Sequence, residues 1–286
     1  MNGLLLHSRT KASVEQIINN PLHAIGIEAE AGSGKKHLSL YIASQIIQVK
    51  NILSYPYLLT IDCNDSKIGI EDMRSAIEFL SLKIPGNKKY KRCLIIWSLE
   101  KLGLEAQNSL LKSLEEPPAD TIIIVTTTAK KNLLPTTASR MSWLSVVPVD
   151  LKASMGYFSD EYDADKVIRS YNIADGKVGM MVNLLDNSGG QAFIGYIEKV
   201  KVLLRMDRFG RLQGIDALTK DKDFDLAIFL LALAKVYQSA IKGEINKGKK
   251  PSKKMLLALN KIILAQETSK YNANQKALLT DIFYNL

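Results

Sequence analysis

A glycine-rich segment, Ala29–Lys36 (AEAGSGKK), combines residue types that can bind phosphate. It follows an apolar run, His23–Ala29, and precedes a stretch in which Leu38, Ile42 and Ile46 recur at helical spacing. A strand, a glycine loop and a helix in this order are the context that a phosphate-binding loop requires, and backbone N–H groups at such a helix start attract phosphate oxygens. The candidate nucleotide-binding residues are Gly32, Ser33, Gly34 and Lys35.

The loop departs from the usual motif at both ends. Ala29 replaces its first glycine, and Lys36 replaces the Ser or Thr whose hydroxyl holds Mg²⁺. A protonated ammonium has donors and no lone pair, so it cannot ligate a metal. Two interpretations stay open. Either the glycines only make a tight turn that packs a helix on a strand, or the loop still binds ATP.

The elements that position this loop are predicted from apolar periodicity. Leu94–Trp97 and Thr121–Val125 are short, apolar and β-branched-rich, which indicates buried strands. Leu104–Glu116 between them has an apolar stripe typical of a helix, and Pro117 and Pro118 end it. A strand, a helix and a strand at this spacing predict a right-handed βαβ unit in an α/β domain with a parallel sheet.

Three segments resemble the bacterial clamp-loader AAA+ family of DNA polymerase III. Asn108–Pro118 is similar to the family's helix A-N-A-L-L-K-T-L-E-E-P-P, and Ile68–Arg74 resembles its I-x-I-x-x-I-R. Leu134–Arg140 resembles L-L-P-T-I-x-S-R-C, with Met141 in place of the cysteine. The details favour the delta-prime subunit. The alternative is an ordinary amphipathic helix in an unrelated α/β domain.

The resemblance implies a subunit without ATPase activity of its own, working within a DNA polymerase III holoenzyme. Where the family has I-I-D-E-A-E-x-L, this chain has Trp97 and Ser98 in place of the two acids, while Glu100 aligns with a later acid. Together with Lys36, three positions needed for Mg²⁺ and water are lost. The family's four-cysteine zinc module is absent, so we expect no zinc and no required cofactor.

The resemblance also implies two functional surfaces. Arg140, following Ser139, would act in trans as an arginine finger on ATP held by a neighbouring subunit. Lys112, with Asn108, would contact DNA phosphate. The alternatives are that Arg140 anchors the chain to a local carboxylate, and that Lys112 pairs with Glu116 one turn further on.

We expect three domains from the motifs and the helical periodicity. They are an AAA+ nucleotide-binding-like domain at 1–149, a helical lid at 150–188 and a helical collar for oligomerisation at 189–286. Ser188–Gly190 is the predicted linker. The predicted collar helices are Phe193–Arg205, Phe224–Lys242, Lys253–Thr268 and Gln275–Tyr284.

Composition limits the class of partner. The 286 residues carry a formal net charge of +9, which favours polyanions such as nucleic acid. The longest apolar run, Leu226–Ala234, is well below the ~20 residues of a membrane span, and we expect a cytoplasmic protein. Cys63 and Cys93 form no C-x-x-C pair. Lys242–Lys254 holds six lysines and one acid, which is usually a solvated loop and less often a DNA contact.

The leading hypothesis is a non-hydrolysing stator subunit of the hetero-oligomeric ring that loads the sliding clamp onto primed DNA. Its partners would be the other clamp-loader subunits, primed DNA and, indirectly, the clamp, with no membrane. One alternative is an active ATPase with an aberrant phosphate-binding loop, which measured turnover would reveal. Another is the clamp-opening delta subunit, which generally lacks the Ser-Arg pair.

Overall fold

The computed structural model describes residues 4–64, 68–186, 190–221, 223–269 and 274–284. The chain divides into two compact units, Met1–Val182 and Asn183–Leu286. The helices predicted for the lid belong largely to the first unit, so the two compact units do not separate the predicted lid from the sheet domain. The lid and collar boundaries therefore stay predictions, and most of the predicted linker lies outside the described residues.

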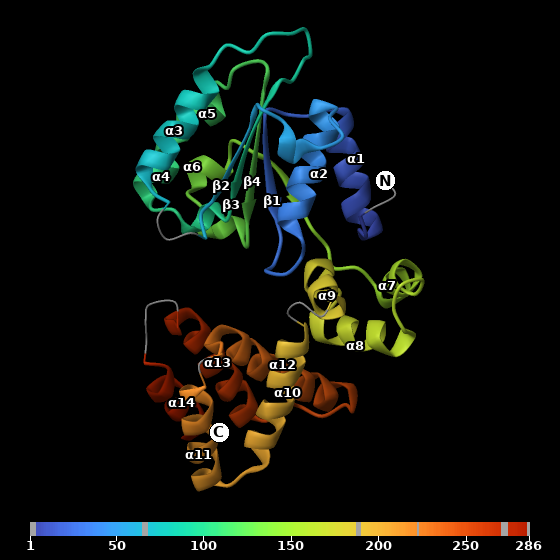
Figure 1. Cartoon of the computed structure of the whole chain (residues 1–286), viewed down its shortest axis with the longest axis vertical. Coiled ribbons are helices and arrows are strands. Elements are labelled where there is room, and N and C mark those ends of the chain that lie inside the picture. Colours follow the sequence, from blue (N-terminus) through green and yellow to red (C-terminus); the bar gives the residue numbers. More distant parts are fainter. Residues whose placement is uncertain (1–3, 65–67, 187–189, 222, 270–273, 285–286) are drawn as a thin grey trace. The chain divides into compact units, whose positions relative to one another are not determined.

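The first unit is built on a five-stranded sheet with the order β2-β3-β4-β1-β5, and every neighbouring pair is parallel. This confirms the predicted α/β fold class (Figure 1). Because all strands run the same way, their carboxyl ends share one edge, where the glycine loop begins. The strands are β1 Ala24–Glu28, β2 Leu58–Asp62, β3 Arg92–Trp97, β4 Thr121–Thr127 and β5 Ser142–Ser145.

Helices cover both faces of the sheet, and the alternation of buried side chains along β3 shows how. Cys93 and Ile95 belong to the core under α1 (Ser8–Asn19) and α2 (Lys35–Ile47). Leu94 and Ile96 point the other way, into the core that also holds Met73 of α3 and Leu114 of α5. A strand buried on both faces reads as a continuous apolar run, which is why this segment was recognisable in the sequence.

The helix predicted over Leu104–Glu116 is interrupted. It forms α4 (Leu104–Ser109) and α5 (Leu111–Glu115), and the Leu110 N–H donates to Gln107 O at 3.3 Å, a bond one residue tighter than in an α-helix. Both halves keep their apolar stripe against the sheet, so the packing is as expected although the single helix is not. The segment α3 spans Ile70–Ser81, and the Gly69 N–H donates to Asp72 at its start.

Three helices follow the sheet: α7 (Leu151–Phe158), α8 (Ala164–Ala174) and α9 (Val178–Leu185). The turn between α8 and α9 requires a glycine. Gly176 has φ +73°, and a Cβ there would lie 2.2 Å from the Val149 carbonyl oxygen. Gly176 O in turn accepts a hydrogen bond from Val149 N at 3.0 Å. This hydrogen bond and the close approach of the two backbones hold the turn against the segment that follows the sheet.

The second unit is entirely helical in its described part. Its helices are α10 Gly190–Arg205, α11 Arg208–Lys220, α12 Leu226–Asn246, α13 Lys253–Thr268 and α14 Gln275–Tyr284. Four were predicted, and α11 was not, because Gly210 and Gly214 weaken its helical pattern. A Cβ on Gly214 would lie 2.4 Å from the end of the Leu203 side chain of α10, so that side chain would have to shift. Asn274 caps α14, accepting from Ala277 N at 3.1 Å.

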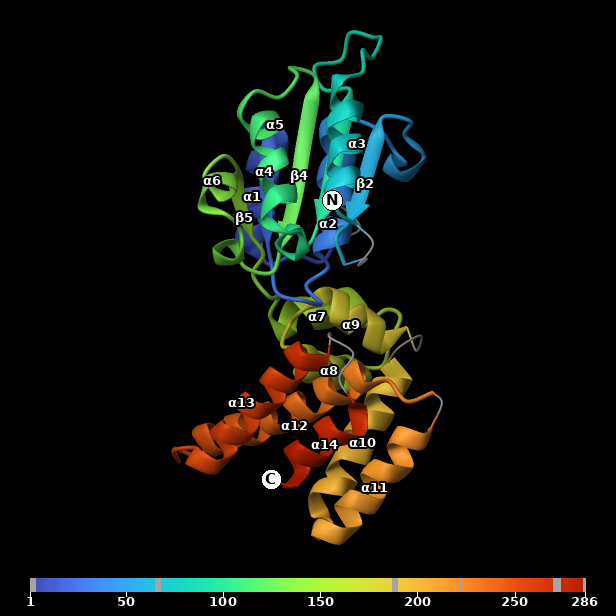
Figure 2. The same cartoon turned by 90° about the vertical axis from the view of Figure 1, so that its left-hand side faces the viewer.

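The helix α12 is long and apolar enough, by length and composition alone, to cross a membrane. Its burial and neighbours show a different role. Phe229, Leu230 and Leu233 are fully buried, and α10 and α13 both pack against the helix. Phe229 also meets Phe224 and Phe283 ring to ring. We therefore describe α12 as the core helix of the helical unit (Figure 2).

Candidate functional site

The glycine loop lies at the carboxyl end of β1 and leads into α2. Gly32 and Gly34 both have φ +82°, a conformation that L side chains rarely adopt, which explains the glycines. Lys35 does not extend from the loop. Its Nζ donates to the Ala29 carbonyl at 3.0 Å, and partial burial lowers the pKa of its ammonium against the opposing effect of Glu100. The four predicted loop residues thus form one backbone turn with the lysine folded onto it.

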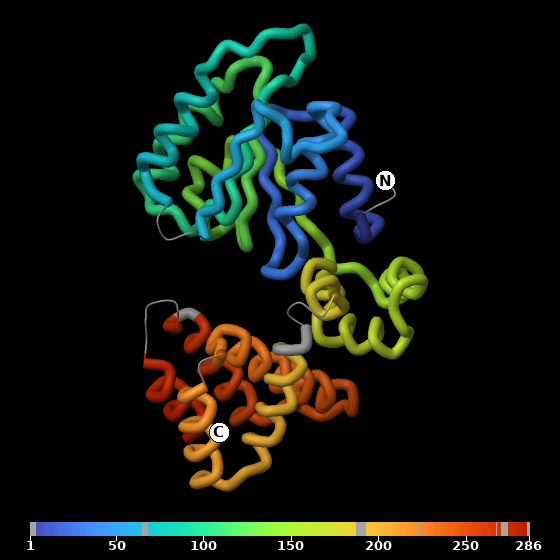
Figure 3. Tube along the Cα trace, in the orientation of Figure 1, coloured from blue at the N-terminus to red at the C-terminus, as the bar shows by residue number. Residues whose placement is uncertain are grey.

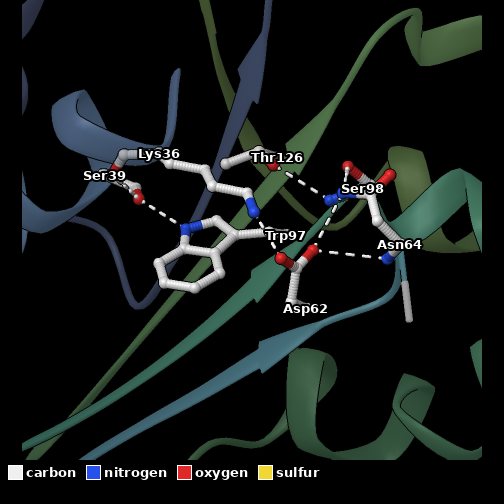
Figure 4. Close-up of polar contacts among 7 residues, drawn as sticks. All are labelled: Lys36, Ser39, Asp62, Asn64, Trp97, Ser98 and Thr126. Atoms are coloured by element: carbon white, nitrogen blue, oxygen red, sulfur yellow. Dashed lines mark hydrogen bonds and ion pairs between the residues drawn. The ribbon is translucent and has the colours of Figure 1, made fainter. Parts of the chain in front are cut away.

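Lys36 forms an ion pair with Asp62 at the end of β2 (Figure 4). Its Nζ also lies 5.0 Å from the centre of the Trp97 ring, within cation–π range. Burial alone would raise the pKa of Asp62, but hydrogen bonds from Lys36 and Asn64 outweigh it and leave that pKa below its ordinary value. The residue that replaces the magnesium-binding hydroxyl therefore places a cation at the site and holds it with a carboxylate.

Trp97 and Ser98, which replace the two acids of the family pattern, form hydrogen bonds with other residues of the chain. The indole Nε1 of Trp97 donates to Ser39 Oγ at 2.9 Å. Ser98 has φ +59°, its backbone N–H donates to Thr126 Oγ1 at 3.0 Å, and its hydroxyl accepts from Asn64 at 3.0 Å. Neither side chain offers a carboxylate for Mg²⁺ or for a water molecule.

Glu100, which aligns with a later acid of the family pattern, bonds to Thr128. One of its carboxylate oxygens accepts from the backbone N–H of Thr128 at 3.0 Å and from its hydroxyl at 2.8 Å. The carboxylate therefore holds the end of β4 in place. It does not substitute for the acids missing at Trp97 and Ser98.

The start of α9 lies directly on the glycine loop. Met180 N–H donates to Gly32 O at 2.7 Å, and a Cβ on Gly179 would lie 2.8 Å from Gly34 N. Lys177 pairs with Glu30 at 2.6 Å. The cavity beside these contacts is about 10 Å³, room for roughly one water molecule. Its lining includes Leu5, Leu6, Ser33, Val146, Val149, Gly176 and Val178.

Mg²⁺ with ATP, the cofactor usual for this fold, does not fit these residues. The cation position is held by the Lys36 ammonium, Trp97 and Ser98 supply no carboxylate, and the α9 backbone covers Gly32 and Gly34. Sequence reasoning found the loop and the missing acids. It did not find Asp62, Gly179 and Met180, because their roles depend on which distant segments the fold brings to the loop.

Arg140 follows the one-turn helix α6 (Pro135–Ala138) and is partly exposed. Its Nε donates to Glu115 Oε1 at 2.6 Å, and the guanidinium also bonds to the Thr136 carbonyl. Ser139 Oγ donates to the same Thr136 oxygen at 3.1 Å. The local carboxylate considered as an alternative partner therefore exists: it is Glu115, at the end of α5.

Lys112 and Asn108 are both exposed, on α5 and α4. Within the part of the chain that the structure describes, Lys112 makes no ion pair, and Glu116 is not its partner. The local explanation weighed for Lys112 is thus absent here. An exposed ammonium without a protein partner is available to an external anion, whereas the finger candidate Arg140 lies beside Glu115.

Of the solved structures that this chain resembles, one with a TM-score of 0.55 supports the same fold. The match to a DNA polymerase III gamma subunit-related protein of Thermotoga maritima covers 96% of this chain and 97% of that protein, with a TM-score of 0.55 and 20% sequence identity. Thermotoga maritima RuvB, a Holliday junction branch migration motor, matches at 0.46 and 13%, over 82% of this chain and 74% of its own. The Bacillus subtilis clamp loader delta protein matches at 0.39 and 10%, over 95% and 97%. No curated protein sequence matches significantly.

A family profile identifies the chain more directly. The profile described as "DNA polymerase III, delta subunit" matches residues 8–150, half of the chain. The match begins at α1 and ends at the residue before α7, so it contains the sheet, the glycine loop and Arg140. This chain therefore belongs to the DNA polymerase III delta-subunit family of clamp-loader AAA+ proteins.

Proposed function

We propose that this chain is a delta-prime subunit: a non-hydrolysing member of a clamp-loader ring that supplies Arg140 to ATP bound by a neighbouring subunit. The observation that carries the proposal is an asymmetry within one unit. Lys36, Trp97 and Ser98 are engaged with other parts of the chain where the family has residues for ATP use. The Ser139–Arg140 pair is nevertheless present and partly exposed.

Arg140 suits this role by its chemistry. A guanidinium is permanently charged, and its planar fork matches phosphate oxygens. It can stabilise the charge that develops as the γ-phosphoryl group leaves, an effect of ~10³ to 10⁵ in kcat for the best-studied fingers. Breaking the ion pair between Arg140 and Glu115 requires little free energy, because a partly exposed pair contributes less than about 1 kcal/mol to stability.

The remaining partners follow from the same assignment. The other subunits complete the ring, the sliding clamp is engaged through them, and primed DNA lies against α4 and α5. Lys112 and Asn108, both exposed there, contact its phosphates without reading sequence. The protein acts in the cytoplasm, requires neither zinc nor bound ATP, and hydrolyses none.

A clamp-opening delta subunit is the second candidate, favoured by the description of the matched family. The two differ in one residue pair and one activity. The delta-prime assignment needs Ser139 and Arg140 beside a neighbour's ATP, whereas a delta subunit binds the clamp on its own. Clamp binding by the isolated chain, measured by gel filtration, would favour delta.

The deciding experiment reconstitutes the ring with Arg140→Ala, Arg140→Lys and Glu115→Gln. If Arg140 is an arginine finger, both Arg140 variants assemble normally and have the melting temperature of the wild type. DNA-stimulated hydrolysis of the ATP bound by the neighbouring subunit then falls by about 10³-fold or more. Arg140→Lys keeps the charge and loses the fork, so it is impaired as well.

Glu115→Gln is the matched control, because it removes the same ion pair and keeps the guanidinium. A finger predicts nearly normal turnover for this variant. If Glu115→Gln loses turnover as severely as Arg140→Ala, or if Arg140→Ala has normal turnover, Arg140 is only a local anchor and the proposal is wrong.

A further inference from the structure

The positive charge of the chain is concentrated in the helical unit. The chain has 38 basic and 29 acidic side chains, and residues 183–286 hold 17 of the basic and 10 of the acidic ones. The helical unit therefore carries a net charge of +7 out of the +9 of the whole chain. Segment 242–254 alone holds six lysines and one glutamate, a net +5. Most of the excess charge therefore belongs to a single connection, the one between α12 and α13.

A short turn connects α12 to α13 (Figure 3). Gly248 has φ +72° and ends α12, its N–H donating to Ile245 O at 2.9 Å. Lys249 N–H donates to Glu244 O at 3.0 Å. Ser252 caps α13, its hydroxyl accepting from Met255 N at 3.2 Å. Since α12 and α13 pack on each other, the lysines are displayed on a fixed helical hairpin.

We define the basic loop as five exposed lysines of this hairpin: Lys247, Lys249, Lys250, Lys253 and Lys254. Among the described residues none of the five is paired with an acid. Other lysines of the same unit are paired, for example Lys220 and Lys276, which both contact Asp216. The lack of partners is therefore a local property of the basic loop.

The basic loop does not stabilise the fold. Lys253 and Lys254 occupy the first turn of α13, where the helix macrodipole favours acids and disfavours cations. Five like charges on one connection also repel one another, which costs free energy of folding at low salt. An anionic ligand with several charges would relieve both effects.

We propose that the basic loop binds the phosphate backbone of DNA. Lysine ammonium groups are compact point charges that bind phosphate without base recognition. The sequence between Tyr237 and Tyr271 contains no aromatic residue, so the basic loop itself offers no ring for base stacking and its contact is with the backbone. Membership in a DNA-replication family makes DNA the polyanion at hand.

Other polyanions fit less well. A helix that lies on a membrane carries cations along its polar face, whereas these lysines are gathered at one end of α13 and on the turn before it. The proposed surface is also separate from Lys112, which belongs to the other unit. It does not depend on the role of Arg140.

The test measures DNA binding by the full isolated chain with a labelled 30-base-pair duplex and its single strand, between 50 and 200 mM salt. We expect micromolar, sequence-independent binding with a slope of log K against log salt near −4.5 for the duplex if all five lysines engage phosphates. Replacing the five lysines by alanine should weaken binding at least about tenfold at low salt and flatten that slope.

The matched control removes five exposed, unpaired lysines of the first unit and has the same net charge. They are Lys11, Lys50, Lys83, Lys131 and Lys152. The control should bind DNA nearly as wild type does. A charge reversal confined to the turn, Lys249→Glu with Lys250→Glu, leaves α13 untouched and should also abolish most binding, so a folding defect in the fivefold variant cannot obscure the result.

Three outcomes would overturn the proposal. One is equal weakening by the basic-loop and control variants, which would show that only net charge matters. Another is unchanged binding in both basic-loop variants. The third is binding to vesicles containing phosphatidylserine, or to polyglutamate, as tight as to DNA. Failure of the Arg140 experiment would leave this measurement unaffected, because it involves neither neighbours nor ATP.

Discussion

Lys36 shows that the loss of nucleotide chemistry at this site rests on several mutually dependent residues. Its ammonium needs the Asp62 carboxylate, and the face of Trp97 lies beside it. Trp97 in turn donates to Ser39 on α2. Restoring one residue of the usual motif would leave the others with unmatched partners. We therefore regard the three substitutions as one packed arrangement.

Replacing Lys36 by Met should lower stability at pH 7 by less than about 1 kcal/mol, because the pair is 44% and 36% exposed and solvent screens it. The pKa of Asp62 is below its ordinary 3.8 in the folded protein. The pair's contribution is thus complete above that value and is lost as pH falls through the folded pKa. Urea unfolding at pH 7 and pH 3 should show the wild-type advantage shrinking in acid.

Asp62→Asn is the control for this prediction, since it removes the titrating group and should abolish the pH dependence of the difference. An advantage of wild type that is the same at both pH values would mean that Lys36 stabilises through its packing on Trp97 instead.

The sequence predicted which residues at the site depart from the family pattern. It did not predict which residues these side chains contact in the folded chain. Trp97, Ser98 and Arg140 were identified from their positions in motifs. Their partners are Ser39, Thr126 and Glu115. These lie 25 to 58 residues away in the chain, so they become neighbours only through the strand order and the helix packing.

At the scale of elements, the contact between α9 and the glycine loop leaves no room for a side chain. Gly179 meets backbone atoms of Gly34 and Gly32, which cannot move away as a flexible side chain could. Glycine at this position lets two backbones touch. The start of α9 and the glycine loop therefore share one packing arrangement.

Gly179→Ala should destabilise the first unit by about 1–3 kcal/mol, the usual cost of adding an atom to a filled contact. Gly156→Ala is the matched control: it lies in α7, and a Cβ there meets nothing within 4 Å. That change should be neutral or stabilise by up to about 1 kcal/mol, because alanine favours the helix. Chemical unfolding of both variants measures the difference, and equal stabilities would contradict the packing described for α9.

Elements with strong periodicity were predicted well, and elements shaped by packing were not. The strands predicted at Leu94–Trp97 and Thr121–Val125 lie within β3 and β4, and the helices predicted at Lys253–Thr268 and Gln275–Tyr284 coincide with α13 and α14. The break at Leu110 and the whole of α11 were missed. In α11 Gly210 and Gly214 weaken the helical signal, and Gly214 also lies against Leu203 of α10.

At the scale of the whole molecule, the Lys36 ammonium pairs with Asp62 and the backbone of α9 contacts the glycine loop, which leaves ATP with Mg²⁺ without its usual binding groups. ATP with Mg²⁺ at 1 mM should therefore leave the melting temperature of the isolated chain unchanged. A ligand at a hundred times its Kd would add ~2.7 kcal/mol and raise the midpoint by several degrees. Steady-state ATP turnover should stay at background, and turnover that Lys35→Ala abolishes would refute this expectation.

Both cysteines of the chain are sealed inside the first unit. Cys63 is 5% exposed and Cys93 is fully buried, and desolvation raises the pKa of the Cys63 thiol to about 12 and that of Cys93 as well. At neutral pH neither thiol supplies the thiolate that maleimides and iodoacetamides attack. The native chain is thus a ready background for single-site labelling: one cysteine introduced at Lys249 would be the sole reactive thiol, and a fluorophore there could follow DNA binding without further engineering.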